Sequence, residues 1–147
     1  MASTAVTETY FWKTVKNNLS DEYTHLSRIE NTAGTGISDV SGCRKGKEVW
    51  IELKVSHGKR VHFRTSQRAW IMTRTGVGGT VWVLIRIEDD VVLYRAKEVL
   101  ASKFQVAADT KSFSILLTDL PQPVHRSTKP VAWKEISKII FENNSED

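Results

Sequence analysis

Residues 80–87 form an almost uninterrupted apolar segment in which branched side chains dominate, and its longest continuous run is Val81–Ile85. A membrane-spanning helix needs about 20 apolar residues, so this run is too short to cross a bilayer. It is instead typical of a strand that is buried on both faces. The segment therefore predicts a central β-sheet that is covered by helices.

The rest of the chain supplies patterns for such a sheet and its helices. Residues 9–19 place apolar side chains at helical spacing, and 65–75 lie between a capping threonine, Thr65, and a glycine. All three prolines fall within 121–130, which indicates a linker, and the last of them could open a final helix. Residues 20–29 are ambiguous. The other expected strands are 37–42, 48–55, 91–95 and 112–117, and the other expected helices are 96–104 and 131–142. This order of helices and strands predicts a mixed α/β domain with a central sheet flanked by helices.

Composition favours one intracellular globular domain with a polyanionic partner. The chain has 147 residues, of which 40% are hydrophobic and 26% charged, as in ordinary globular proteins. The single cysteine, Cys43, and the absence of a basic and apolar leader favour a reducing, cytoplasmic location. Residues 43–75 carry nine lysines and arginines against two glutamates, whereas the rest of the chain is slightly acidic. Nucleic acid is the commonest partner of such a block, although a solvated basic face explains the charge equally well.

A hairpin brings two carboxylates together in the most informative part of the sequence. If residues 37–42 and 48–55 turn on Lys45-Gly46, Asp39 lies opposite Glu52, with Cβ atoms about 4.5–5.5 Å apart. Two negative charges at that distance need a proton or a cation between them, and a hard divalent cation would serve. Lys54 lies two residues on, on the same face of the strand. This set suits phosphodiester hydrolysis, whereas a slip of one residue, or a plain surface ion pair of Glu52 and Lys54, would leave no site.

The residues Asp39…Glu52-Leu53-Lys54 resemble the PD-(D/E)XK nuclease signature. The wider pattern is similar to the VRR-NUC and phage Holliday-junction-resolvase-like branch of that superfamily. It includes Arg28-Ile-Glu-Asn, Gly36-Ile-Ser-Asp-Val, Trp50-Ile-Glu-Leu-Lys-Val, Gln67 and the glycine turn before the apolar strand. The resemblance covers roughly residues 25–95. It implies a restriction-endonuclease-like α/β core in a single domain over 1–147, with a C-terminal helical extension over about 121–147.

The resemblance also implies roles for individual residues. Asp39 and Glu52 would ligate Mg²⁺ or Mn²⁺, with the Val55 carbonyl as a further ligand, and Lys54 would position or activate the attacking water. Gln67 matches a glutamine near the active site of such enzymes. Glu30 matches an acidic residue on the first helical segment that supports or supplies a metal ligand. Ser38 stands where the motif usually has proline, which shapes the strand and takes no part in the chemistry.

Several other side chains are candidates for contact with nucleic acid. Trp50 shares the face of the motif and could stack on a base, although core packing is commoner for such a residue. His57 and His62 lack partners at zinc-ligand spacing, so a structural zinc site is not expected. The cationic candidates for the DNA backbone are Arg28, Arg44, Lys45, Lys47, Lys59, Arg60, Arg64 and Arg68.

These features predict a metal-dependent endodeoxyribonuclease. By resemblance the substrate would be branched DNA such as a four-way junction, and symmetric cutting of two strands would need a homodimer. A phage-encoded protein acting in the host cytoplasm would fit this description. A non-catalytic nucleic-acid-binding module with a degenerate site remains an alternative, as does a restriction-type or RNA-cutting nuclease. The sequence assigns no role to residues 96–147.

Overall fold

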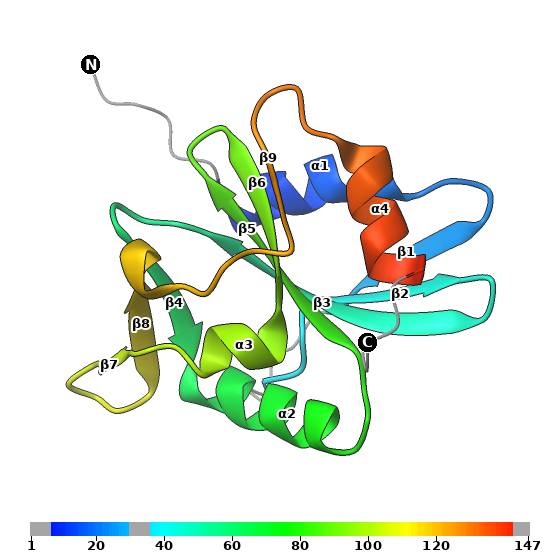
Figure 1. Ribbon diagram of the computed structural model, residues 1–147. Coiled ribbons are helices and arrows are strands. Elements are labelled where there is room, and N and C mark those ends of the chain that lie inside the picture. Colours follow the sequence, from blue (N-terminus) through cyan, green and yellow to red (C-terminus); the bar gives the residue numbers. More distant parts are fainter. Residues whose placement is uncertain (1–6, 30–35, 143–147) are drawn as a thin grey trace.

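A six-stranded mixed sheet forms the centre of the protein (Figure 1), in the computed structural model that describes residues 7–29 and 36–142. Its strand order is β1-β2-β3-β5-β6-β9, and only β3 and β5 run parallel to each other. The prediction of an α/β fold with a central sheet is therefore confirmed. The strands are β1 (Thr24–Arg28), β2 (Val40–Arg44), β3 (Lys47–Val55), β5 (Val81–Ile87), β6 (Asp90–Arg95) and β9 (His125–Ser127).

Helices cover both faces of this sheet, because β5 presents apolar side chains to both sides. Helices α1 (Glu8–Leu19) and α4 (Trp133–Glu142) pack on one face through Phe11, Val15 and Ile140. Helices α2 (Thr65–Gly76) and α3 (Ala96–Leu100) lie on the opposite side (Figure 1). Among the described residues, none of these helices has the length and apolar character that crossing a bilayer demands.

A second, three-stranded sheet shares the face of α2 and α3. It consists of β4 (Arg60–Arg64), β8 (Ser112–Leu116) and β7 (Gln105–Val106), in the order β4-β8-β7. Val61, Phe63, Phe113 and Ile115 point inward and join the core beneath α2 and α3. A short 3₁₀ helix, η1 (Leu117–Asp119), follows β8.

The hairpin of β2 and β3 has the predicted register. Val40 pairs with Ile51 and Arg44 with Lys47, so the turn falls on Lys45-Gly46. Lys45 and Gly46 have φ values of 51° and 82°, as a two-residue turn of type I′ requires. Asp39 immediately precedes the first pair and so lies at the level of Glu52.

Some predictions of local structure were wrong, and two segments that were left without an assignment are strands. Residues 24–28, left ambiguous, form strand β1, since Thr24 and Leu26 are buried in alternation with more exposed neighbours. Residues 61–64, assigned to no element, belong to β4. The expected linker over 121–130 contains β9, so the C-terminal region is not purely helical. Helix α3 ends at Leu100, and α2 is capped at Arg64 rather than at Thr65, whose hydroxyl donates instead to the Lys111 carbonyl oxygen.

Candidate active site

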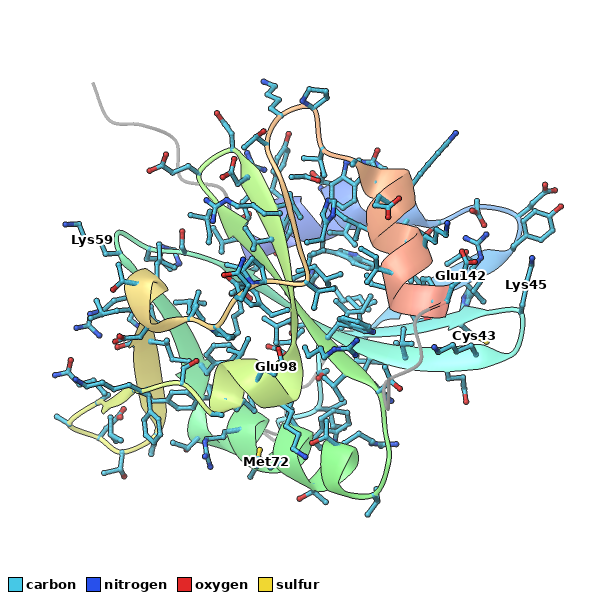
Figure 2. All side chains as sticks on the ribbon, viewed as in Figure 1. Cys43, Lys45, Lys59, Met72, Glu98 and Glu142 are labelled. Carbon is cyan, nitrogen blue, oxygen red and sulfur yellow. The ribbon has the colours of Figure 1, made fainter. Side chains whose placement is uncertain are left out.

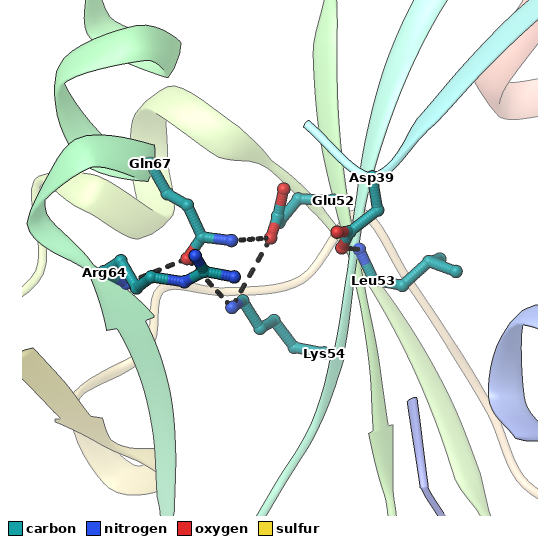
Figure 3. Close-up of polar contacts among 6 residues, drawn as sticks. All are labelled: Asp39, Glu52, Leu53, Lys54, Arg64 and Gln67. Carbon is teal, nitrogen blue, oxygen red and sulfur yellow. Dashed lines mark hydrogen bonds and ion pairs between the residues drawn. The ribbon is translucent and has the colours of Figure 1, made fainter. Parts of the chain in front are cut away.

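Glu52, Lys54 and Gln67 form a buried polar cluster between β3 and the start of α2 (Figure 3). Gln67 Nε2 donates to Glu52 Oε2 at 2.6 Å, and Lys54 Nζ donates to Gln67 Oε1 at 3.1 Å. Lys54 Nζ also lies 3.4 Å from Glu52 Oε2. The Arg64 backbone N–H donates to Gln67 Oε1 at 2.8 Å and so fixes the amide at the beginning of α2. The alternation of β3 brings Glu52 and Lys54 to one face, as predicted, and Gln67 meets them there.

Asp39 reaches the same strand from the end of the loop before β2. Its Oδ2 accepts from the Leu53 backbone N–H at 3.0 Å, while its own carbonyl accepts from Ile29 at 2.7 Å. These two bonds fix both the side chain and the backbone at the point where β2 begins. Asp39 is only half-buried, so its carboxylate is available to a ligand.

Glu52 is a buried acid with an unused oxygen. Its exposed fraction is 0%, and among the described residues its Oε1 has no hydrogen-bond partner. Burial raises the pKa of the Glu52 carboxyl well above its ordinary value, although the Lys54 ammonium lowers it. Asp39 raises this pKa further, through its charge and through a side-chain hydrogen bond that the two carboxyl groups form when they share a proton. A buried, unpaired carboxylate oxygen beside a second acid is a costly arrangement unless a proton or cation is bound there.

The oxygen atoms around Glu52 Oε1 are ligands that suit a hard divalent cation. The amides of Trp50 and Ser56 donate to carbonyls at the β5 edge, whereas the Leu53 amide meets Asp39 on the β2 edge. By this alternation, the Val55 carbonyl faces the side of β3 on which Asp39 lies. The described residues contain no cluster of three or more histidine, cysteine or acidic side chains with metal-binding geometry. Two carboxylates and a carbonyl are nevertheless a fitting set for Mg²⁺, which commonly binds one or two carboxylates together with water and substrate phosphate.

Glu8, which the sequence analysis missed, brings a further carboxylate toward this site. It is the first residue of α1, which Thr7 caps through a 3.0 Å bond to the Tyr10 amide. Burial raises the pKa of the Glu8 carboxyl, Lys54 lowers it and Asp39 raises it, with smaller effects of His57 and Arg28. The residue is exposed overall, and it forms no metal-binding group of three acidic side chains with Asp39 and Glu52. An acidic residue in a first helical turn is common for electrostatic reasons, so the sequence alone carried no signal for this role.

Glu30, the acidic residue that the resemblance indicated, lies outside the described residues. The chain before it is strand β1 and not a helix, so the expected helical segment is absent at residues 24–28. The described acid that comes from the first helix is Glu8.

The basic candidates do not form one surface. Lys45 at the hairpin tip and Lys59 before β4 lie on opposite sides of the molecule (Figure 2). Arg44 near the tip is held by Asp21 at 3.7 Å and by the hydroxyls of Thr24 and Ser137. The first group, by the hairpin, comprises Arg44, Lys45 and Lys47, and the second, around β4 and the start of α2, comprises Lys59, Arg60, Arg64 and Arg68.

Arg64 and Arg28 are the members of this set with an interaction at or beside the polar cluster. Arg64 caps α2 next to Gln67, and Arg28 is close enough to lower the pKa of Glu8. Arg68 stacks its guanidinium over the Phe104 ring at 5.5 Å. Trp50 is half-buried and packs edge-on against Trp70, with ring centroids 5.1 Å apart, as the packing alternative for this residue predicts.

The comparisons with known proteins support the fold. No protein-family model and no curated protein matches the sequence. Among solved structures, the chain is similar to Archaeoglobus fulgidus Hjc, described as a Holliday junction resolvase from an archaeal hyperthermophile. The match has a TM-score of 0.55 and 14% sequence identity, and it covers 80% of this chain and 90% of that one. At this identity the likeness shows a shared fold.

Proposed function

We propose that this protein is a metal-dependent endonuclease of the PD-(D/E)XK type that hydrolyses DNA. The observation that carries the proposal is the unpaired, buried Oε1 of Glu52, which lies beside Asp39 and on the same strand face as Lys54. The likeness in fold to a Holliday junction resolvase supports branched DNA as the substrate class. Membership of the VRR-NUC branch, a homodimer with two active sites, and a phage origin with action in the host cytoplasm are further parts of this proposal.

Each residue of the cluster has a task in the proposed reaction. Asp39, Glu52 and the Val55 carbonyl would hold Mg²⁺ or Mn²⁺, and the Glu8 carboxylate would add negative charge near them. A divalent cation held by these residues would supply polarisation of the scissile phosphate and a lower pKa for water. The Lys54 ammonium, held by Gln67 and Glu52, is positioned to orient the attacking water or to neutralise negative charge that develops on the phosphate. Gln67 orients Lys54 and Glu52 relative to each other.

Cleavage of defined substrates tests the proposal. Labelled four-way junctions, linear duplex, single-stranded DNA and RNA are incubated with Mg²⁺, Mn²⁺ or EDTA. We expect metal-dependent nicks at the junction, and their loss in Glu52→Gln and Asp39→Asn. Glu48→Gln is the matched control, because Glu48 is an exposed glutamate on the same strand at the hairpin end.

Three outcomes would change the assignment. Equal cleavage by Glu52→Gln and the control would reject this site. Discrete fragments from linear duplex, or cleavage of RNA, would keep the site and reject the junction substrate. Salt-sensitive binding without cleavage of any substrate would favour the non-catalytic module.

A further inference from the structure

The small sheet β4-β8-β7 presents a polar and cationic outer face that the proposed chemistry does not use. Alternate residues of β4 point outward, namely Arg60, His62 and Arg64, while Val61 and Phe63 are buried. Ser114 pairs with His62 on one side and with Gln105 on the other, so the same face continues across the sheet. Burial lowers the pKa of His62, and the neighbouring His57, Arg60 and Lys54 lower it further. The two arginines therefore carry the positive charge of the strand.

An open depression of about 370 Å³ lies on this face. Arg60 enters it with Nη1 bonded to Ser114 Oγ at 2.9 Å, which leaves the other guanidinium donors for a ligand. Among the described residues Lys103 makes no ion pair, and Asp119 at the rim is not within ion-pair distance of either cation. The lining comprises Arg60, Lys103, Phe104, Gln105, Ser114 and Leu116, together with Asp119.

Phe104 is the unusual member of this lining. It is 42% exposed, although exposed phenylalanines are uncommon on a polar surface. The ring is held in place by Phe113, at 5.1 Å between centroids, and by the guanidinium of Arg68 at 5.5 Å. A rigid, exposed aromatic ring beside two cations and an amide is the combination with which proteins bind single-stranded nucleic acid. The ring would stack on a base and the cations would contact the phosphate.

The depression is connected to the candidate active site by β4. Arg60 lines the depression, and Arg64, four residues further, caps the helix whose Gln67 contacts Glu52. At a rise of roughly 3.3 Å per residue, Arg60 and Arg64 are about 13 Å apart. Stacked nucleotides advance about 3.4 Å each, so this distance spans about four of them and fewer if the strand is extended.

From this geometry we propose that the depression on the β4-β8-β7 sheet binds an unpaired nucleotide of the DNA strand that continues past Arg64 to the candidate active site. Its base stacks on Phe104, and its phosphate is held by Arg60 and Lys103. The inference rests on the proposed nuclease function for the position of the cut but not for the binding site itself. It gives residues 103–105 a role in substrate selection, because a base held in a continuous duplex cannot present its face to Phe104.

Binding without cleavage tests this inference directly. The full chain carrying Glu52→Gln is titrated in EDTA with fluorescent single-stranded DNA and with the matched duplex. We expect Phe104→Ala to weaken single-strand binding about tenfold, within the range known for one stacked base. Lys103→Gln should lower the slope of log affinity against log salt by about 0.7. Val106→Ala, at an exposed apolar residue of β7 outside the depression, and Lys111→Gln are the matched controls.

Phe104 also packs on Phe113, so Phe104→Ala could weaken binding by disturbing the fold. A second measurement therefore separates base stacking from a loss of structure. A 2-aminopurine base moved along the strand should be quenched most at one position, by the wild type and by Phe104→Trp but not by Phe104→Leu. Equal affinities of Phe104→Ala and Val106→Ala, or quenching that Phe104→Leu preserves, would overturn the inference and leave the ring as a contact for another protein. Phe104-dependent binding by a protein that cleaves nothing would overturn only the nuclease proposal, and junction cleavage with Phe104-independent binding would overturn only this one.

Discussion

Gln67 is the side chain on which the geometry of the candidate site most depends. Its amide joins the carboxylate of Glu52, the ammonium of Lys54 and the backbone N–H of Arg64. Replacement by alanine leaves these groups without that partner in a place where Glu52 is fully buried. We therefore expect Gln67→Ala to destabilise the fold and to disorganise the site together.

The size of the effect follows from the contacts that are lost. A hydrogen bond to a charged group contributes about 1.5–3 kcal/mol and an ordinary one about 0.5–1.5 kcal/mol. Gln67 makes two of the first kind and one of the second. The ion pair between Lys54 and Glu52 remains in the variant, so the sum of the three hydrogen-bond energies is an upper limit. We expect a loss of about 3 kcal/mol in the free energy of unfolding. For a domain of this size, that lowers the melting temperature by roughly 6–12 °C.

Urea and thermal unfolding followed by circular dichroism measure this loss. Thr73→Ala is the control, because Thr73 is an exposed residue of the same helix. A difference between the two variants of less than about 1 kcal/mol would refute the reasoning, since it would mean that water or side-chain movement replaces the Gln67 contacts without penalty.

Three further predictions concern neighbouring residues. Because burial raises the pKa of Glu52, its contribution to stability is complete below the unfolded pKa of about 4.3 and is lost as the pH rises through the folded pKa. Without divalent cations, Glu52→Gln should therefore gain stability over wild type as the pH rises above the unfolded pKa. Urea titrations at a series of pH values measure this difference, and a difference that stays constant would contradict the prediction. Gly36 has a φ of 78°, and a Cβ at this position would lie 2.0 Å from the Ser66 carbonyl oxygen. Gly36→Ala should therefore lower the free energy of unfolding by about 2 kcal/mol more than Gly46→Ala, because Gly46 has a similar φ but open space around it. Equal losses for the two variants would exclude the clash. Glu8→Gln should weaken Mn²⁺ binding in calorimetry, because it removes a negative charge that interacts with Lys54 and Asp39. The exposed control Glu22→Gln should leave the affinity unchanged, and an unchanged affinity of Glu8→Gln would show that its charge takes no part.

Local rules were sufficient to predict the centre of the site. Strand alternation placed Glu52 and Lys54 on one face, and the glycine-containing turn set the register that brings Asp39 to their level. Gln67 came from the resemblance alone, because a glutamine in a first helical turn has no distinctive pattern. The contacts among these four residues needed the crossover through β4 and α2, which no short-range rule supplies.

The missed features depend on contacts between distant segments. Strand β4 has the sequence Arg-Val-His-Phe-Arg, in which two apolar residues alternate with charged or polar ones. So short a pattern does not predict a strand by itself, and β4 forms because β8 pairs with it. Glu8 lies 31 residues before Asp39, and its position follows from the packing of α1 on the sheet. Phe104 was predicted to be the last residue of a helix over 96–104. It lies beyond the end of α3 and packs against Phe113. In each case tertiary packing decided the outcome.

The central claim is that Asp39 and Glu52 form a divalent cation site. Crystals of the protein soaked in Mn²⁺ and measured at the manganese absorption edge would locate the ion by its anomalous scattering. We predict one strong peak between the Asp39 carboxylate and Glu52 Oε1, within reach of the Val55 carbonyl, and its absence from crystals of Glu52→Gln. Manganese bound elsewhere, or no peak at this position while Glu52 keeps its unpaired oxygen, would contradict the claim.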